Sequence, residues 1–552
     1  GTKEELDSLV YIAEHLPFYE GTLINKKNRT YGMMVTVSAE VMNSPARVAL
    51  VNEIEKITKE YTDKYQVQMH YSGLPYIRVV NAENIKREMY MFIALSLLIT
   101  AIILYLFFRS FRIVGFCVAI IGISVVWAMG FMAVLGIKIT LLTAMLPPLL
   151  IVIGIPNCVF MVNKYHAEYV LHGNKIKALQ RMVQKIGNAT LLSNLTTAAG
   201  FATFIITSSQ ILKEFGLIAF ISITTVFIIC LILIPSVFSY LPVPDNKQTR
   251  HLHNAFINKV IDGIIHLVVN RRNIIYALTL SAVVLSFIGI TQMKTTGYMV
   301  DDLKESDPIR QDLAFFESNF DGLMPLEITI DFHKPNQVFK LSNLEKLDRL
   351  SNIIQQDPDI SRPLSIIEAV KFADQAYYNG KAEYYKLPTN TNKNFILKYA
   401  LGSSSGMNNM AKSFIDSTNQ KVRLTFRIKD IGTKKMEAKE DSLYRTIAKI
   451  FPPEKTTAKV TGSSIIFFKG NQYLIKNLFS SLALAILLIA GFMAWMFKSK
   501  RMVLIALVPN VIPQLITAAI MGYAGIPIKA STILVFSVAF GISVDNTIHY
   551  LA

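Results

Sequence analysis

Long apolar runs alternate with two polar stretches along this chain, and the alternation predicts a polytopic α-helical membrane protein. A helix that crosses about 30 Å of hydrocarbon needs roughly 20 mostly apolar residues. Nine such runs are visible, at about 89–108, 113–135, 139–162, 189–208, 215–241, 273–292, 475–497, 502–524 and 530–552. The two polar stretches, residues 1–86 and 293–470, predict two α+β domains outside the bilayer.

Shorter periodicities within the polar stretches predict their elements. In the first stretch, residues 31–41 and 67–71 alternate like strands and residues 45–61 have helical spacing, which predicts a strand-helix-strand module. The second stretch repeats this order at its end, with a strand at 422–428, a helix at 434–450 and a strand at 458–460. Its earlier part predicts a strand at 326–332 and helices at 342–356, 366–378 and 404–417.

The segment between the two membrane halves has a different character. Residues 253–269 are apolar on one helical face and carry Lys259 and Asp262 on the other, which predicts an amphipathic helix on the inner membrane surface. A plain connector between the halves remains an open alternative.

Residues 72–163 and 461–552 align without a gap at a constant offset of 389 (461 − 72). The two copies share 18 identities over these 92 positions, including Gly73/Gly462, Thr143/Thr532 and Asn157/Asn546. The chain is therefore predicted to be internally duplicated. Completing both copies would require a span before the present first one and two after residue 552, so we expect twelve spans in the whole protein.

This duplication and the apolar runs set the predicted domain boundaries. They are an incomplete extracytoplasmic α+β domain at 1–86, a first membrane half with spans 2 to 6 at 87–241, a cytoplasmic amphipathic linker at 242–272, span 7 at 273–292, a second extracytoplasmic α+β domain at 293–470, and a truncated second membrane half with spans 8 to 10 at 471–552.

Composition agrees with a chain that alternates between lipid and water. Hydrophobic residues make up 52% of the 552 positions, and the mean hydropathy is +0.38, which excludes an ordinary soluble enzyme. The formal charge of +17 does not indicate a nucleic-acid partner. Its Lys and Arg clusters all fall on one side of alternating spans, which is the positive-inside pattern. We expect an integral protein of a bacterial inner (cytoplasmic) membrane, with both large domains extracytoplasmic.

Several kinds of chemistry are absent from the sequence. It has no Cys/His metal spacing, no Gly-rich phosphate loop and no nucleophile elbow, and its three cysteines lie in apolar spans, so no disulfide, metal or organic cofactor is predicted. The absence of a P-loop favours an ion gradient over ATP as the energy source. The predicted class is a secondary active transporter and not an enzyme.

One position separates the two copies chemically, since the second reads Val544-Asp545-Asn546 where the first reads Ile155-Pro156-Asn157. Asp545 lies about 16 residues into the last span, roughly 24 Å along a helix. Burying it ionised costs about 2.5–3.5 kcal/mol, so it can bind and release a proton as its hydration changes. His549 shares its helical face four residues on, which predicts a relay of Asp545, Asn546 and His549.

Structural alternatives accompany each of these residues. Asp545 could instead lock helix packing through a hydrogen bond to Asn157 or Thr143, and His549 could be a solvated residue at the helix end. Pro156, with Pro147 and Pro148, predicts a broken or flexible fourth span, so the facing set of hinge and polar residues is Pro156, Asn157 and Thr143. A polar cluster in the fifth span could join helices or contact protons; it comprises Ser193, Asn194, Thr196 and Thr197.

Three segments carry a resemblance to a known family. Gly541-Ile-Ser-Val-Asp-Asn-Thr-Ile-His549 resembles the G-x-x-x-D signature in the tenth helix of the resistance-nodulation-division (RND) superfamily. Residues 193–201 with Glu214-Phe-Gly216 are similar to its fifth and sixth helices, and residues 154–165 resemble the fourth helix of sterol-sensing members. The chain as a whole resembles the superfamily's lipid-exporting (MMPL-like) branch and the related Patched and Niemann-Pick type proteins.

The resemblance implies a fold and a mechanism. It implies an RND-type duplicated membrane domain, a sterol-sensing-like first half, and proton-driven transport with helices four and ten side by side at the core. Many members carry an acidic residue in both of these helices, whereas this chain has Pro156 in one of them.

The predicted function is proton-motive-force-driven export of a hydrophobic or lipid-like substrate. Its expected partners are membrane lipids and that substrate, and the sequence leaves open a homo-oligomer or an accessory periplasmic partner. Two alternatives stay open. One is a transport-inactive lipid- or sterol-sensing or scaffold protein, which the missing first-half carboxylate favours. The other is a drug-efflux pump, although the compact second soluble domain favours lipid-type cargo.

Overall fold

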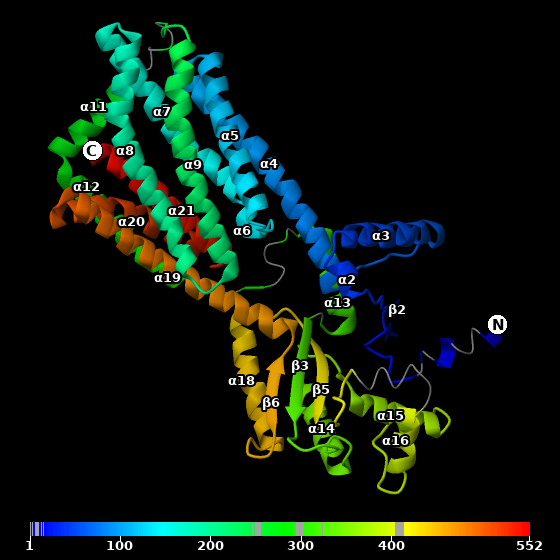
Figure 1. Ribbon diagram of the computed structural model, residues 1–552. Helices are drawn as coiled ribbons and strands as arrows, with labels where there is room; N and C mark the ends of the chain where they lie inside the picture. The colour runs from blue at the N-terminus through cyan, green and yellow to red at the C-terminus, as the bar shows by residue number, and fades with distance from the viewer. Residues whose placement is uncertain are drawn as a thin grey trace. The chain divides into compact units, whose positions relative to one another are not determined.

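The computed structural model describes residues 2, 4–5, 10–12, 14, 16–245, 248, 255–293, 297–298, 303, 305–322, 324–402 and 413–551. Two compact units are present, and each is described by itself. The membrane unit comprises residues 80–295 and 473–552, and the α+β unit comprises residues 1–79 and 296–472. Figure 1 shows the helices of the first and the small sheet of the second.

The membrane unit is built from long helices that match the nine predicted spans. They are α4 (Leu74–Phe108), α5 (Phe111–Val134), α6 (Leu141–Ala144) followed by α7 (Leu146–His172), α8 (Lys175–Ala202), α9 (Gln210–Tyr240), α12 (Arg272–Thr291), α19 (Ser463–Phe497), α20 (Lys500–Tyr523) and α21 (Ala530–Leu551). Among the described residues, eight helices are long and apolar enough to cross a bilayer, and Thr532–Ile548 within α21 forms a shorter apolar stretch. The predicted polytopic helical fold is confirmed.

The internal duplication is visible in the backbone. Helices α4 and α19 begin and end at positions that differ by 389 residues, and so do α5 and α20. Gly136 and Gly525 both have positive φ, 65° and 68°, and close the turn after α5 and α20. The Thr143 hydroxyl accepts a hydrogen bond from the backbone N–H of Thr140 at 2.8 Å, and the Thr532 hydroxyl accepts one from Lys529 at 2.9 Å. The two copies therefore share their turns as well as their helix lengths.

The predicted irregularity of the fourth span is only partly right. The helix is interrupted at Met145, between α6 and α7, because Pro147 and Pro148 lack the N–H groups that would continue the preceding turn. Helix α7 then runs without a break through Pro156. The counterpart of this region, α21, is continuous, since Phe536 and Ser537 replace the two prolines.

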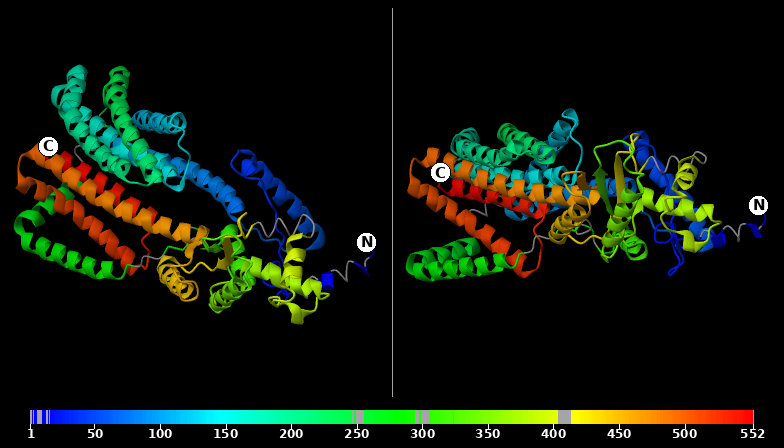
Figure 2. Two further views of the ribbon diagram at one scale, coloured as in Figure 1. Left: turned by 60° about the horizontal axis from the view of Figure 1, so that its bottom comes forward. Right: turned by 90° about the horizontal axis from the view of Figure 1, so that it is seen from below.

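Two helix pairs define the packing of the membrane unit. In Figures 1 and 2, α8 and α9 run beside each other, and α12 lies along α20. The α12–α20 seam is unusually close. A Cβ atom on Gly522 would lie 1.9 Å from the Gly289 carbonyl oxygen, and one on Gly289 would lie 2.8 Å from Ala519. Small residues here let the two backbones touch, as at many membrane helix crossings.

Helix α11 (Ala255–Asn270) occupies the predicted amphipathic segment. Its described side chains are exposed on the apolar face, which includes Val260, Ile261 and Ile264, and on the charged face, which includes Lys259 and Asp262. An apolar face without protein cover is what a helix lying on a membrane surface needs. The first residues of the predicted segment, 253–254, lie outside the described residues.

The α+β unit centres on a four-stranded antiparallel sheet of order β4-β5-β3-β6. The strands are β3 (Met324–Asp331), β4 (Leu364–Ser365), β5 (Lys421–Ile428) and β6 (Thr457–Thr461). The covering helices are α13 (Pro308–Phe320), α14 (Leu341–Ile354), α15 (Ile366–Tyr377), α16 (Lys393–Gly402) and α18 (Thr433–Ile450). Alternate residues of β3 and β5 enter one core. The strands and helices predicted for the second polar stretch are confirmed, except at 404–417, where residues 404–412 lie outside the described residues and residues 413–417 form a turn and a β-bridge.

The strand-helix-strand module predicted for the first polar stretch is wrong in its strands. Helix α3 (Ala46–Tyr65) is present and follows the short helix α2 (Ala39–Met42), but the only strands among the described residues of this stretch are β1 (Ile24–Asn25) and β2 (Thr30–Tyr31). Residues 32–38 and 67–71 are not assigned to strands, and Met33, Met34 and Val35 are exposed. An alternating pattern favours extended backbone, but a strand also needs a neighbouring strand to receive its hydrogen bonds.

We expect the Gly522→Ala substitution to destabilise the membrane unit by about 1–3 kcal/mol, because the new methyl group has no room against the Gly289 carbonyl. The matched control is Gly491→Ala in α19, where nothing lies within 4 Å of the added Cβ. That variant should be neutral or more stable by about 0.5–1 kcal/mol. Thermal unfolding in detergent measures both variants, and equal midpoints would contradict the close seam.

Candidate functional site

Asparagine side chains join helices α7 and α8 in the bilayer core. Asn157 donates to Asn194 Oδ1 at 3.1 Å, and Asn194 donates back to Asn157 Oδ1 at 2.9 Å. Asn194 also donates to the Thr190 carbonyl at 2.8 Å, which uses its second N–H. Both amides are buried. Because hydrocarbon offers no alternative partner, this reciprocal pair fixes the register of α7 against α8.

Helix α8 also contacts α21, on which Asp545 lies. The Thr197 hydroxyl donates to the Gly541 carbonyl at 3.4 Å, and Gly541 has no side chain to keep the helices apart. Asp545 follows Gly541 by one helical turn, on the same face of α21. Its side chain is buried, with 8% exposed. The carboxylate therefore sits where α21 packs against its neighbours in the membrane unit.

The apolar neighbours of Asp545 on its own helix belong to a buried cluster. Val544 and Ile548 are fully buried and pack with Phe540, Ile489 and Met493. Surroundings of this kind disfavour a fixed charge. A carboxylate in such a place suits reversible protonation better than permanent ion pairing.

A further polar contact ties α21 to α20, and the sequence interpretation missed it. Asn510 accepts hydrogen bonds from the Ser543 hydroxyl at 2.6 Å and the Thr547 hydroxyl at 2.9 Å. Its own amide donates to the Ala506 carbonyl. The available signal was an asparagine between Pro509 and Pro513 inside an apolar run, with two hydroxyls four residues apart in the next helix.

The first copy has apolar or small residues at every equivalent position. Ile121 stands at the place of Asn510, Gly154 at that of Ser543, Cys158 at that of Thr547 and Pro156 at that of Asp545. A Cβ on Gly154 would lie 3.3 Å from the Ile121 side chain, so Ile121 lies beside Gly154 where the second copy has the hydrogen bond between Ser543 and Asn510. The difference between the copies extends beyond one carboxylate to a whole polar seam.

The other predicted site residues lie in different surroundings. Thr143 caps α6 and donates to the Lys138 carbonyl at 3.1 Å. Pro156 is partly buried within α7, and Asn546, the counterpart of Asn157, is exposed. For His549 the structure describes the backbone, as part of α21, and no side-chain surroundings.

The predicted cluster in the fifth span lies on α8 and divides its contacts. Asn194 bonds to α7 and Thr197 to α21, while the Thr196 hydroxyl donates to the Leu192 carbonyl of its own helix. Ser193 is fully buried, and its hydroxyl has no hydrogen-bond partner among the described residues. Helix α8 is thus the polar bridge between the two membrane halves.

A second buried carboxylate, Glu168, was also missed. It lies near the end of α7 with 1% of its side chain exposed, and Lys185 of α8 donates to it at 2.9 Å. Lys164, Arg181 and His172 approach its oxygens at 3.3, 3.4 and 3.5 Å. Lysine and histidine four residues on either side of a glutamate were the sequence signal. The network braces the α7–α8 corner, and its partners are predominantly permanent charges.

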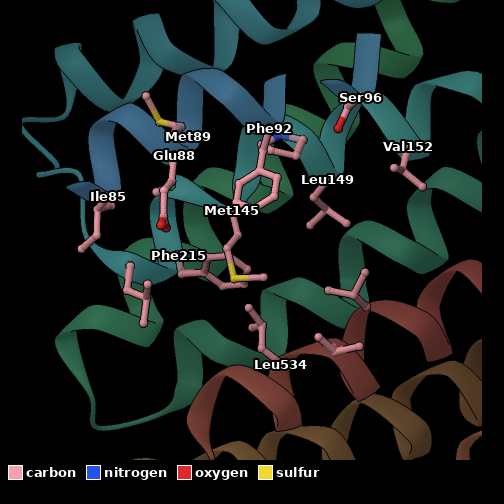
Figure 3. Close-up of a pocket in the computed structure, with 15 residues that line it drawn as sticks. Ile85, Glu88, Met89, Phe92, Ser96, Met145, Leu149, Val152, Phe215 and Leu534 are labelled. Atoms are coloured by element: carbon pink, nitrogen blue, oxygen red, sulfur yellow. The ribbon is translucent and has the colours of Figure 1, made fainter. Parts of the chain in front are cut away.

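An apolar cavity of about 340 Å³ lies in the membrane unit, and two of its helices, α7 and α21, also carry Asn157 and Asp545, the buried residues that we call the polar layer. Figure 3 shows α4 contributing Ile85, Glu88 and Phe92, with Met145, Leu149, Phe215 and Leu534 facing them from other helices. Val535 and Val538 of α21 complete the wall, and Glu88 is its one charged residue among those described. Within the described residues, no group of three or more His, Cys, Asp or Glu side chains could hold a metal ion.

Comparison with known proteins identifies the family. The family model described as "MMPL family" matches residues 17–255 and 347–548, which is more than half of the chain. This chain belongs to the MMPL family. The family assignment to the MMPL branch that the sequence suggested is therefore confirmed, and this MMPL protein is an integral membrane protein of transporter-like architecture.

Two relatives place its fold and extent. The cryo-EM structure of the hedgehog release protein Disp from the water bear Hypsibius dujardini matches with a TM-score of 0.56 at 14% identity, covering 84% of this chain and 60% of that one. The Methanocaldococcus jannaschii protein MJ1562, described as a membrane protein, is 24% identical over 170 residues, which are 31% of this chain and 44% of the relative. The MMPL chain thus spans less than two thirds of either relative.

We expect Asn157→Ala and Asn194→Ala each to cost about 1–3 kcal/mol, since each leaves a buried amide without its partner. The double variant should cost less than the sum of the two, with a coupling of about 0.6–2 kcal/mol. Denaturation in mixed detergent micelles measures the cycle. Thr196→Ala is the control, because its hydroxyl donates to a carbonyl of its own helix. The free-energy changes of Thr196→Ala and Asn157→Ala should add. Free-energy changes that add for Asn157→Ala and Asn194→Ala would refute the pair.

Proposed function

We propose that this MMPL protein is a proton-driven transporter that exports a hydrophobic or lipid-like molecule. One observation carries the proposal: the same two helices bear the polar layer and the wall of the apolar cavity. Helix α21 carries Leu534, Val535 and Val538 at the cavity and Asp545 in the layer. Helix α7 carries Leu149 and Val152 at the cavity and Asn157 in the layer.

This arrangement supports mechanical coupling between proton and cargo. Asp545 follows Leu534 by eleven residues, which is about 16 Å along a helix. A helix transmits a shift over such a distance with little loss, because its backbone hydrogen bonds keep it stiff. Protonation of Asp545 would change how α21 packs against α8, and the same movement would change the width of the cavity.

The cost of an ionised carboxylate in the membrane is similar in size to the free energy that one proton releases in crossing it. An ionised carboxylate in the membrane costs about 2.5–3.5 kcal/mol. One proton that crosses a potential of 100 mV releases about 2.3 kcal/mol, and a pH difference adds to this. A single carboxylate that loads from one side and unloads to the other is therefore sufficient to couple the gradient to a conformational change.

The basic residues around Glu168 indicate how the protein is oriented in its membrane. The Lys and Arg of the Glu168 network, Lys164, Arg181 and Lys185, lie at the end of the bundle that the positive-inside pattern assigns to the cytoplasm. We propose a bacterial inner membrane, with the α+β unit outside the cytoplasm. Membrane lipids surround the spans, and a lipid-like cargo occupies the cavity.

A second function has its own supporting observation. The polar seam of the second copy is replaced in the first by Ile121, Gly154, Pro156 and Cys158, so the first copy has no carboxylate at the position equivalent to Asp545. A lipid sensor or scaffold needs the cavity but no proton relay. Such a protein would bind lipid without responding to a pH gradient.

We expect Asp545→Asn to lower proton-driven efflux of a fluorescent lipid from proteoliposomes by at least about tenfold, because an amide cannot be protonated at this site. Tyr550→Phe is the matched control: its side chain is exposed on the same helix, and transport should persist. Circular dichroism and gel filtration establish that both variants fold. Full efflux in Asp545→Asn would reject the relay. Lipid binding by the wild-type protein that does not change with the pH gradient would favour the lipid sensor.

We expect Val535→Trp to fill the cavity and to reduce photolabelling by a lipid probe by at least about tenfold. Val126→Trp is the control, since Val126 lies on α5 and is exposed outside the cavity. Proton uptake on acidification should be unchanged in both variants, because Asp545 is untouched. Labelling that survives Val535→Trp would place the cargo elsewhere, and labelling by a polar drug in preference to lipid would favour a drug-efflux pump.

A further inference from the structure

A second hollow, of about 240 Å³, lies within the α+β unit. Its apolar side is formed by Leu23, Met33 and Met34 from the β1–β2 region and by Phe316 and Phe320 of α13. Met33 and Met34 are largely exposed, at 88% and 77%. Exposed methionines beside aromatic rings make an adaptable apolar surface of the kind that takes flexible chains.

The floor of this hollow holds Arg427 of β5. Its guanidinium lies over the Phe320 ring, 5.9 Å from the ring centre, and donates to the Gly21 carbonyl. It makes no ion pair with a carboxylate among the described residues. Burial lowers the pKa of the Arg427 guanidinium from its ordinary value, although Asp321 nearby opposes the shift. Asp321 therefore offsets part of the desolvation of Arg427, but no carboxylate among the described residues lies within ion-pair distance of the guanidinium.

Neighbouring arginines show that the sheet does supply anions elsewhere. Arg423, four residues earlier on β5, pairs with Glu327 at 3.6 Å. Arg362, which also lines the hollow, pairs with Glu368 at 3.7 Å and donates to the Pro17 carbonyl. Arg427 differs from both, because its accessible side faces the hollow and not a carboxylate.

We propose that the hollow binds an amphiphile with an anionic head, a carboxylate or a phosphate, which pairs with Arg427 while the chain lies against Met33, Met34 and Phe316. Arginine suits such heads because its planar group can donate two parallel hydrogen bonds. At about 240 Å³ the hollow is just below the usual range for whole ligands, about 300–1,000 Å³, so it holds the head and the first part of the chain. This binding does not rest on proton coupling and requires no transport.

A purely structural role for Arg427 makes a different prediction. In that case the guanidinium only braces the Gly21 turn, and the hollow would take apolar chains without regard to their heads. Comparison of probes with the same chain and different heads therefore separates the two roles.

The experiment uses the purified full chain in lipid nanodiscs and a diazirine-bearing palmitate. We expect crosslinks to peptides that contain Met33–Met34 or Phe316–Phe320, at least about tenfold above those of the hexadecanol analogue. Dodecyl phosphate should compete with the label. Inorganic phosphate alone should not compete if the ligand is a lipid, and competition by it would assign the site to a free anion. Equal labelling by acid and alcohol would overturn the anionic head.

Variants test the residue directly. Arg427→Gln should lower palmitate labelling of these peptides by about tenfold or more, and the control Arg423→Gln should not. If Arg427→Gln fails to fold, Met34→Glu replaces it, since Met34 is exposed and the new carboxylate would occupy Arg427. Met34→Gln is its neutral control. Undiminished labelling in Met34→Glu would overturn the proposal, whatever the outcome for proton-driven efflux.

Discussion

Hydrocarbon contains no water, so each polar group that this MMPL protein carries into the bilayer must be satisfied by another part of the protein. This constraint explains why Asn157 and Asn194 bond reciprocally, why Asn510 gathers two hydroxyls, and why Thr190, Thr196 and Ser481 bond within their own helices. The Ser193 hydroxyl is an exception among the described residues. Asp545 differs in kind, because its charged form is costly in such apolar surroundings and its neutral form is less so. The proposed proton coupling would use this difference.

The two copies share one backbone scaffold and differ in the polar residues that they place on it. Helix ends, the glycine turns at Gly136 and Gly525, and the threonine caps agree at an offset of 389 residues. Between these fixed points, one copy has Asn510, Ser543, Thr547 and Asp545, and the other has Ile121, Gly154, Cys158 and Pro156. Asn510 and its two hydroxyl partners are replaced together by Ile121, Gly154 and Cys158, so the first copy keeps no amide or hydroxyl at these three positions. Paired replacement of this kind is the form that tolerated change takes in a membrane.

The sequence was informative wherever a pattern is local. Apolar run length predicted the spans, and alternation with a clear turn predicted β3, β5 and β6. It failed for residues 31–41, because alternation specifies extended backbone but not the partner strand. For the site, the sequence pointed to Asp545, Asn157 and Asn194 as types of residue, yet their contacts depend on which helices become neighbours. Asn510 and Glu168 were overlooked because one resembled a polar break in a span and the other part of a positive cluster.

The tight seam between α12 and α20 has a mechanical consequence. Two helices whose backbones touch at Gly289 and Gly522, and which are joined by the Tyr523 hydroxyl to the Leu285 carbonyl at 2.7 Å, cannot slide past each other without losing contact along their length. The α8–α21 contact, by comparison, has a long hydrogen bond of 3.4 Å at a glycine. The α12–α20 seam therefore resists sliding, and if α21 moves against α8 during the proposed transport cycle, Asp545 lies on the helix whose contacts change.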